Sequence, residues 1–153
     1  MTQFDETDRK LLAALQRDDR RSLAELGAEV GAPASTVNDR IRRLVRNGVV
    51  TGFHARVSPE ALGLNLLAFV LVGWTDPKVE ADFLARIQAC SAVLECHHVT
   101  GAWNYLLKVR VGTTRNLEAF LSQVVKATEG VQRTETIIAL SSSKETWELD
   151  AGD

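Results

Sequence analysis

The sequence is poor in the features that mark secreted and membrane-embedded proteins. It has two cysteines, Cys90 and Cys96, in 153 residues, which is too few for the disulfide framework of a small extracellular domain. The first ten residues, MTQFDETDRK, are polar, so no leader peptide is expected. The longest apolar run, Leu66–Trp74, is far shorter than the roughly 20 residues that span a bilayer. We therefore expect a cytoplasmic protein with reduced cysteines and no membrane partner.

The sequence also lacks the strong positive charge of many nucleic-acid binders, because its formal net charge is −2. The charge is unevenly divided, however. Residues 1–58 carry ten Lys and Arg against eight Asp and Glu, whereas residues 59–153 carry eight against twelve. Apolar residues make up 45% of the chain, enough for a packed core in one ordinary domain or two small ones. This division favours a front half that faces DNA and a back half with another role.

The most informative stretch is Pro33–Gly48, PASTVNDRIRRLVRNG, which has the period of an amphipathic helix. Its apolar face comprises Val37, Ile41, Leu44 and Val45. Its opposite face carries Ser35, Asp39, Arg42 and Arg46, flanked by Thr36, Arg43 and Asn38, so that short polar residues come first and most arginines later. Pro33 suits the first helical position, and Gly48 suits the end. The short polar residues therefore lie at the end that meets base edges in helix-turn-helix proteins, and the arginines lie where phosphates are expected.

Two shorter helices are expected before this one. The first spans residues 6–16, with Asp5 as its N-cap. The second begins at a capping box formed by Ser22 and Glu25 and ends at Gly31. The residues expected to face the core are Leu11, Leu12 and Leu15 on the first helix and Leu23, Leu26 and Val30 on the second. Two short helices joined by a tight glycine turn, the second of them cationic, give the helix-turn-helix layout.

The segment Val49–Val57 is predicted to form two short strand pieces about Gly52. Such a hairpin is the wing of a winged helix-turn-helix, and it would place Arg56 or His54 beside the DNA backbone, although His54 is more simply an ordinary surface histidine. We assign residues 1–57 to a winged helix-turn-helix DNA-binding domain. Residues 58–65, SPEALGLN, follow as a linker of proline, glycine and polar residues.

The hydrophobic pattern changes after the linker. Strands are predicted at 66–74, 93–100, 105–111 and 131–140, and helices at 76–89 and from Thr113 or Thr114 to about 128. The order β-α-β-β-α-β is the ferredoxin-like signature, so the chain is α+β and residues 66–153 form its second domain. Both helices of such a sheet lie on one face. The other face, with Phe69, Leu71 and Trp74 or the alternate set, needs a cover, which a homodimer of facing sheets would supply.

These features together resemble the Lrp/AsnC (leucine-responsive/asparagine-responsive, or feast/famine) transcription regulators over nearly the whole chain. The resemblance rests on the domain order and on several strings of residues. These are Val37-x-x-Arg40-Ile-x-Arg43-Leu44-x-x-x-Gly48-Val-Val, Leu62-Gly63, and Glu95-Cys-x-x-Val99-Thr100-Gly101-x-x-Asn104-Tyr105-Leu-Leu-Lys-Val109. It implies a dimer that assembles further, to a tetramer or octamer, and a C-terminal domain that binds a small molecule, usually an amino acid, between subunits.

Carried over to this chain, the resemblance places DNA contacts at Ser35, Thr36, Asn38, Arg40 and Arg43. The helix projection puts Arg40 near the margin of the core, which makes an ion pair with an acid of the fold the alternative role for this residue. The effector contacts implied by the resemblance are Thr100, Gly101, Ala102, Trp103 and Asn104, with Thr134 and Thr136 on the last strand of a neighbouring chain.

Asn104 departs from the family, in which an aspartate is common at this position. A carboxylate would pair with the ammonium group of an amino acid, whereas an amide offers a neutral hydrogen bond of roughly half the strength. Three outcomes follow: the ammonium finds another acid such as Glu95 or Glu135, the ligand class differs, or the chain has no effector.

Three functions compete on this evidence. The first is a sequence-specific, effector-responsive transcription regulator that binds double-stranded DNA, and the second is an architectural DNA organiser of the same fold with no effector. A small enzyme or amino-acid-binding module ranks last, because no activated nucleophile, catalytic acid–base pair or phosphate loop is evident. No metal is expected either, since the neighbouring His97 and His98 point to opposite faces of a strand. We therefore expect no catalytic residue and no cofactor other than an amino-acid effector.

Overall fold

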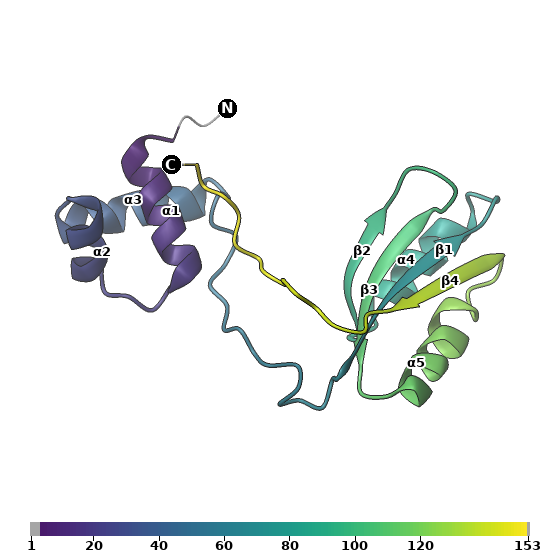
Figure 1. Ribbon diagram of the computed structural model, residues 1–153. Helices are drawn as coiled ribbons and strands as arrows, with labels where there is room; N and C mark the ends of the chain where they lie inside the picture. Colours follow the sequence, from purple (N-terminus) through teal and green to yellow (C-terminus); the bar gives the residue numbers. More distant parts are fainter. Residues whose placement is uncertain (1–3, 153) are drawn as a thin grey trace. The chain divides into compact units, whose positions relative to one another are not determined.

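A computed structural model describes residues 4–152 and divides the chain into two compact units. The first unit contains the chain up to Arg56 together with the residues from Lys144 onward, and the second is Val57–Ser143 (Figure 1). The domain boundaries 1–57, 58–65 and 66–153 stay predictions. The tail from Lys144, which we placed in the ferredoxin-like domain, lies in the first of these compact units.

The first unit contains three helices, α1 (Glu6–Arg17), α2 (Leu23–Val30) and α3 (Ala34–Arg46). The expected caps are present. The Asp5 carboxylate accepts the Asp8 N–H at the start of α1, and the two-way capping box of Ser22 and Glu25 begins α2. Gly31 closes α2 at φ +68°, a left-handed conformation that costs glycine little. Pro33 lies at the N-cap of α3, one position before the first helical residue at which we placed it.

The core of this unit is small and joins all three helices. It consists of the buried residues Leu11, Ala14, Leu26 and Val37, with Leu15, Val30 and Ile41 packed against them. Two residues expected to face inward do not. The side chains of Leu23 and Val45 are 38% and 44% exposed, because each lies at the edge of its helix's apolar stripe, outside this narrow core.

The segment after α3 contains no strand between residues 49 and 58, so the predicted hairpin is wrong. The N–H groups of Val49 and Val50 both donate to the Leu44 carbonyl, at 2.9 and 3.3 Å. These bonds close the end of α3 beyond Gly48, and they use donors that a hairpin ladder would have required. Residues 51–58 are instead an exposed segment without helix or strand.

The second unit has the predicted β-α-β-β-α-β order. Its elements are β1 (Leu66–Gly73), α4 (Val79–Gln88), β2 (Val93–His98), β3 (Tyr105–Val111), α5 (Thr114–Phe120) with the π-helical turn η1 (Leu121–Val125), and β4 (Arg133–Ile138). The strands form one antiparallel sheet in the order β2-β3-β1-β4, so the ferredoxin-like prediction is confirmed. The single helix expected up to residue 128 is therefore α5 followed by η1, which the Lys126 N–H closes onto the Leu121 carbonyl at 2.8 Å.

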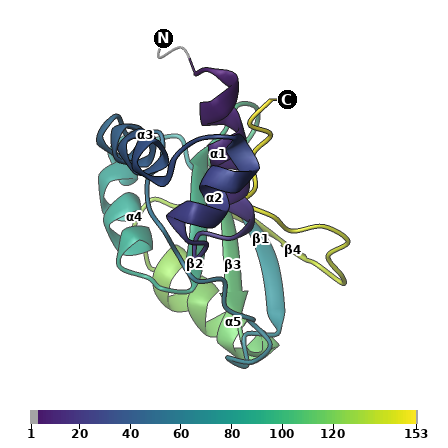
Figure 2. The same cartoon turned by 90° about the vertical axis from the view of Figure 1, so that its left-hand side faces the viewer.

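Helices α4 and α5 cover the same face of the sheet (Figure 1 and Figure 2). On that face, alternate strand residues such as Val70 and Leu107 pack against Phe83 of α4 and Phe120 of α5. The opposite face is open in this chain. Its apolar residues are Phe69, Leu71, Leu106 and Ile137, which neighbour one another across strands β1, β3 and β4.

Trp74, which we placed on the open face, is 7% exposed and belongs to the covered core. It follows the last residue of β1, so strand alternation no longer sets its direction, and its ring lies against Phe83 and Tyr105 at centroid distances of 4.9 and 5.6 Å. No helix within residues 4–152 is long and apolar enough to cross a membrane.

Candidate nucleic-acid interface and effector loop

The outer face of α3 presents the polar residues that the sequence predicted. Ser35, Thr36, Arg42 and Arg46 are exposed, and Asn38 is half-buried. No side chain caps the N-terminus of α3, because Pro33 stands at the N-cap and its side chain has no hydrogen-bonding group. The first-turn N–H groups of α3 therefore have no side-chain partner at the cap, at the end where Ser35 and Thr36 stand.

The arginines of α3 fall into two groups. Arg40 and Arg43 face α1, where the Asp8 carboxylate accepts hydrogen bonds from both: Arg40 Nη1 lies 2.9 Å from Asp8 Oδ1, and Arg43 Nη2 lies 2.7 Å from Asp8 Oδ2. Arg40 also donates to Asp5 Oδ2 at 2.6 Å. The side chain of Asp8 is 3% exposed, so the pairs are shielded on the carboxylate side. We call Asp5, Asp8, Arg40 and Arg43 the acid–arginine brace.

Within the brace, the pKa values of Asp5 and Arg40 are shifted in the directions that keep both side chains charged. The backbone N–H of Asp8, followed by the Arg40 guanidinium, lowers the pKa of the Asp5 carboxyl. Hydrogen bonds to Asp5 and then Asp8 raise the pKa of Arg40 above its ordinary value. The predicted alternative role of Arg40, pairing with an acid of the fold, is therefore confirmed by these contacts.

Arg43 occupies an intermediate position. Its side chain is 46% exposed although it is bonded to Asp8, so part of the guanidinium surface remains available to solvent. Arg42 and Arg46 differ from it, because no carboxylate within residues 4–152 pairs with either of them. Of the arginines on α3, Arg42 and Arg46 are thus the two without a carboxylate partner among the described residues. Sequence reasoning missed the role of Asp8 as the shared partner of Arg40 and Arg43.

In the second unit, the loop Thr100–Asn104 joins β2 to β3. Asn104 fixes this loop to the end of β1, since its N–H donates to the Val72 carbonyl at 3.0 Å and its side-chain Oδ1 accepts the Trp74 N–H at 2.8 Å. An aspartate at this position could accept the same hydrogen bond through a carboxylate oxygen. The amide therefore preserves the acceptor that holds the loop while it removes the negative charge.

The rest of the loop is open to solvent, with Thr100, Gly101 and Ala102 exposed and Gly101 at φ +101°. Trp103 is half-buried, and the Arg133 guanidinium carbon lies 4.7 Å from its ring centroid. A Cβ on Gly73 would come within 2.6 Å of Arg133 Nε, so the absence of a side chain there makes room for this pair.

The two threonines of β4 do not share a face with Arg133. Thr134 and Thr136 are paired with Val72 and Val70, whose side chains point to the helix-covered side of the sheet, whereas Arg133 is paired with Gly73 on the open side. Within one chain the structure therefore does not bring these threonines to the Thr100–Asn104 loop on the open face.

The acids that we considered for an ammonium group have different surroundings. Glu95 is engaged by Lys108 Nζ at 3.1 Å and by His97 Nε2 at 3.2 Å, and these partners lower the pKa of its carboxyl although desolvation is the largest single effect and opposes them. Glu135 is exposed and pairs with Leu71 across the open face. Of the two, Glu135 has the more accessible carboxylate.

His98 is not placed for metal binding with His97. His98 stacks on Tyr105 at a centroid distance of 5.0 Å, while His97 lies on the open face beside Glu95. In the described part of the chain, no three His, Cys, Asp or Glu side chains come together as a metal site.

Comparison with known proteins assigns both units to families. Residues 4–51 match the model of a winged helix-turn-helix DNA-binding domain, and residues 67–149 match the model of the Lrp/AsnC ligand-binding domain. The chain belongs to the Lrp/AsnC family of transcription regulators. The predicted fold class, a winged helix-turn-helix domain joined to a ferredoxin-like domain, is confirmed by these matches, although residues 49–58 contain no strand.

Similar Lrp/AsnC proteins come from bacteria and archaea. The regulator LrpA of Mycobacterium tuberculosis is 41% identical over 135 residues, which cover 88% of this chain and 89% of that protein. The regulator FL11 of Pyrococcus abyssi is 35% identical over 146 residues, which cover 95% of each. A transcriptional regulator of Neisseria meningitidis solved as a complex with L-methionine has a TM-score of 0.92 at 30% identity and covers 96% of both chains. This Lrp/AsnC chain is thus a helix-turn-helix transcription regulator.

Proposed function

We propose that this regulator binds double-stranded DNA through the outer face of α3, with Ser35, Thr36 and Asn38 at base edges and the arginines on phosphates. The observation that carries the proposal is that Arg42 and Arg46 are exposed and have no carboxylate partner in the described part of the chain, while the N-terminal turn of α3 is uncapped. Arginines without a carboxylate partner gain the most binding free energy from a phosphate contact, because no existing ion pair has to be broken.

Arg40 and Arg43 take different roles in this proposal. Arg40, which bonds to both Asp5 and Asp8, holds α3 on α1 and contributes to DNA binding by orienting the helix. Arg43 keeps its bond to Asp8 and offers its exposed edge to a phosphate.

The experiment is a fluorescence titration of labelled duplex DNA, selected by the protein from a random pool, against an unselected duplex of equal length. We expect tighter binding to the selected duplex by a factor of about 10³ or more. Equal affinity for both would replace this proposal by the architectural function without sequence preference.

We further propose that an amino acid is the effector and that it binds at the loop Thr100–Asn104. Support comes from two family structures complexed with L-methionine: the Neisseria meningitidis regulator, and a feast or famine regulatory protein of Mycobacterium tuberculosis with 38% identity and a TM-score of 0.86. In this chain Asn104 carries no charge and its oxygen already accepts the Trp74 N–H, so the proposed partner of the ligand's ammonium group is Glu135 or an acid of a second chain. Thr134 and Thr136 remain proposed contacts from a neighbouring chain.

A thermal-shift screen of the amino acids tests the effector proposal, since a ligand that binds the native state alone raises the melting temperature. We expect L-methionine or a similar apolar amino acid to raise it by several degrees at concentrations well above Kd. No shift with any amino acid at 10 mM or so would contradict the effector proposal and leave the DNA-binding proposal intact.

We also propose a homodimer, formed by the open faces of two sheets and able to assemble further into a tetramer or octamer. Four apolar side chains, Phe69, Leu71, Leu106 and Ile137, form a continuous patch on that face, and such a patch is costly to leave in water. Replacing Leu71 with Glu would put a charge at its centre. Sedimentation equilibrium should give a dimer or larger for the native chain and a monomer for Leu71→Glu; an unchanged mass would move the interface elsewhere.

A further inference from the structure

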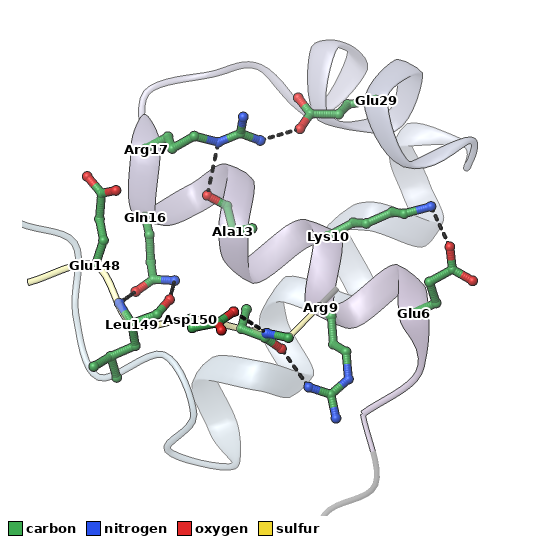
Figure 3. Close-up of a pocket in the computed structure, with 12 residues that line it drawn as sticks. Glu6, Arg9, Lys10, Ala13, Gln16, Arg17, Glu29, Glu148, Leu149 and Asp150 are labelled. Atoms are coloured by element: carbon green, nitrogen blue, oxygen red, sulfur yellow. Dashed lines mark hydrogen bonds and ion pairs between the residues drawn. The ribbon is translucent and has the colours of Figure 1, made fainter.

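The C-terminal tail, residues 144–152, runs along α1 and is fastened to it by side chains of that helix (Figure 3). The Gln16 amide makes two hydrogen bonds to one residue of the tail: Nε2 donates to the Leu149 carbonyl at 2.9 Å, and Oε1 accepts the Leu149 N–H at 2.7 Å. A neighbouring β-strand would satisfy the same two groups in the same way. The side chain of Gln16 therefore holds the tail by its backbone, independently of the tail's charges.

A second fastening lies about two helical turns earlier on α1. Arg9 Nη1 donates to the Ala151 carbonyl at 2.5 Å. Gly152 is at φ +75°, and a Cβ there would lie 2.7 Å from the same guanidinium nitrogen, so the backbone of the tail fits closely around Arg9. The tail is thus docked at two points along α1.

The docked tail also reaches Arg56, the residue that we considered as a DNA-backbone contact. Glu148 Oε1 lies 3.6 Å from Arg56 Nη1, and the Glu145 carbonyl accepts from Arg56 Nη2 at 3.4 Å. Both side chains are well exposed, at 62% for Arg56 and 47% for Glu148, so the pair is weak and easily exchanged.

The tail cancels the positive charge of the DNA-binding unit. Residues 1–56 carry ten Lys and Arg against eight Asp and Glu, a net charge of +2. Residues 144–152 carry one lysine and three acids, a net charge of −2. With this tail docked, the two segments together have a net charge of zero. Because phosphate attraction supplies most of the sequence-independent affinity for DNA, this loss of positive charge opposes binding.

We propose that Arg56 is a further phosphate-binding residue and that the acidic tail masks it, so that DNA and the tail compete for the same cation. A phosphate that displaces Glu148 gains a charge-assisted contact while it breaks an exposed pair. The tail remains attached to α1 through Gln16 and Arg9, so the exchange at Arg56 needs no unfolding. The competition limits non-specific binding most, because that binding depends on charge alone.

The first test compares Glu148→Gln with the native chain in titrations of an unselected DNA duplex at several salt concentrations. This variant removes one charge and leaves the Gln16 and Arg9 bonds, which go to the tail's backbone. We expect two- to fivefold tighter binding at about 50 mM salt and a salt slope that is steeper by about 0.9, the value for one phosphate contact. Glu118→Gln, an exposed acid on α5 in the second unit, is the matched control and should bind as the native chain does.

The second test combines Glu148→Gln with Arg56→Ala. In the native background Arg56→Ala should change DNA affinity little, because the tail already occupies Arg56, whereas in the Glu148→Gln background it should remove the whole gain. A gain that survives Arg56→Ala overturns the assignment of Arg56. Unchanged affinity and slope in Glu148→Gln, or an equal gain in Glu118→Gln, overturns the masking by the tail.

The third test deletes the tail after Ser143, with the melting of the helical unit measured by circular dichroism to establish that it is folded. We expect tighter non-specific binding by at least the factor seen for Glu148→Gln. Weaker DNA binding by the folded, truncated chain would mean that the tail supports DNA binding, and it would overturn the proposal.

Discussion

The acid–arginine brace predicts that Asp8→Asn destabilises the helical unit while keeping the size of the side chain. Asp8 accepts three guanidinium hydrogen bonds, one from Arg40 and two from Arg43, and its side chain is 3% exposed. Removing one partner of a buried ion pair costs about 3–5 kcal/mol. Here the cost is lower, because Arg40 retains Asp5 at 2.6 Å and the side chain of Arg43 is 46% exposed. We therefore expect a loss of about 2–3 kcal/mol.

The assay is chemical denaturation followed by far-ultraviolet circular dichroism, fitted with separate transitions for the two units. The transition of the helical unit should move to lower denaturant with an unchanged m-value, and that of the sheet unit should stay in place. Asp19→Asn, in the loop after α1 and in no ion pair with another described residue, is the control and should change stability by less than about 0.5 kcal/mol. A loss in Asp8→Asn no larger than that of the control would refute the brace as a stabilising element.

Three further predictions concern single residues. Burial, followed by the hydrogen bond to Glu80, raises the pKa of Tyr105 to about 12 from an ordinary 10. The contribution of Tyr105 to stability is therefore complete below pH 10 and is lost as the pH rises toward 12. Tyrosinate absorbance measures the pKa of Tyr105 directly, because the chain has one tyrosine. Asn104→Ala should cost about 1 kcal/mol in the sheet unit by leaving a main-chain N–H without its acceptor, and Asn104→Asp should retain most of that stability, as read by denaturation. Gly27→Ala should destabilise the helical unit by about 1–3 kcal/mol, although alanine favours helices, because its Cβ would lie 2.5 Å from the Ala32 carbonyl oxygen; a stabilised variant would contradict the packing of α2.

Local patterns predicted most of the fold. The capping box at Ser22 and Glu25 and the left-handed Gly31 are signals carried by residues a few positions apart, and each is where the sequence placed it. The β-α-β-β-α-β order followed from changes in hydrophobic period, and the sheet has that topology. These features can be predicted from the sequence because the residues that cause them are close together in the chain.

The features that the sequence did not predict depend on contacts between distant residues. Asp8 and Arg43 are 35 positions apart, and nothing local distinguishes a dipole acid from one partner of a brace. The hairpin predicted after α3 does not form, because the N–H groups of Val49 and Val50 bond to the end of that helix. The segment that follows pairs with no strand within the described residues. The docking of the tail depends on Gln16, which is more than 130 positions away in the sequence.

The central claim is that the exposed, unpaired arginines of α3 bind DNA phosphates. The most direct measurement is the salt dependence of DNA affinity for the double variant Arg42→Ala and Arg46→Ala, with Arg115→Ala on α5 as the control. The account predicts that the slope of log K against log salt becomes shallower by about 1.8 in the double variant, for two lost phosphate contacts, and is unchanged in the control. An unchanged slope in the double variant, with its fold intact by circular dichroism, would contradict the claim.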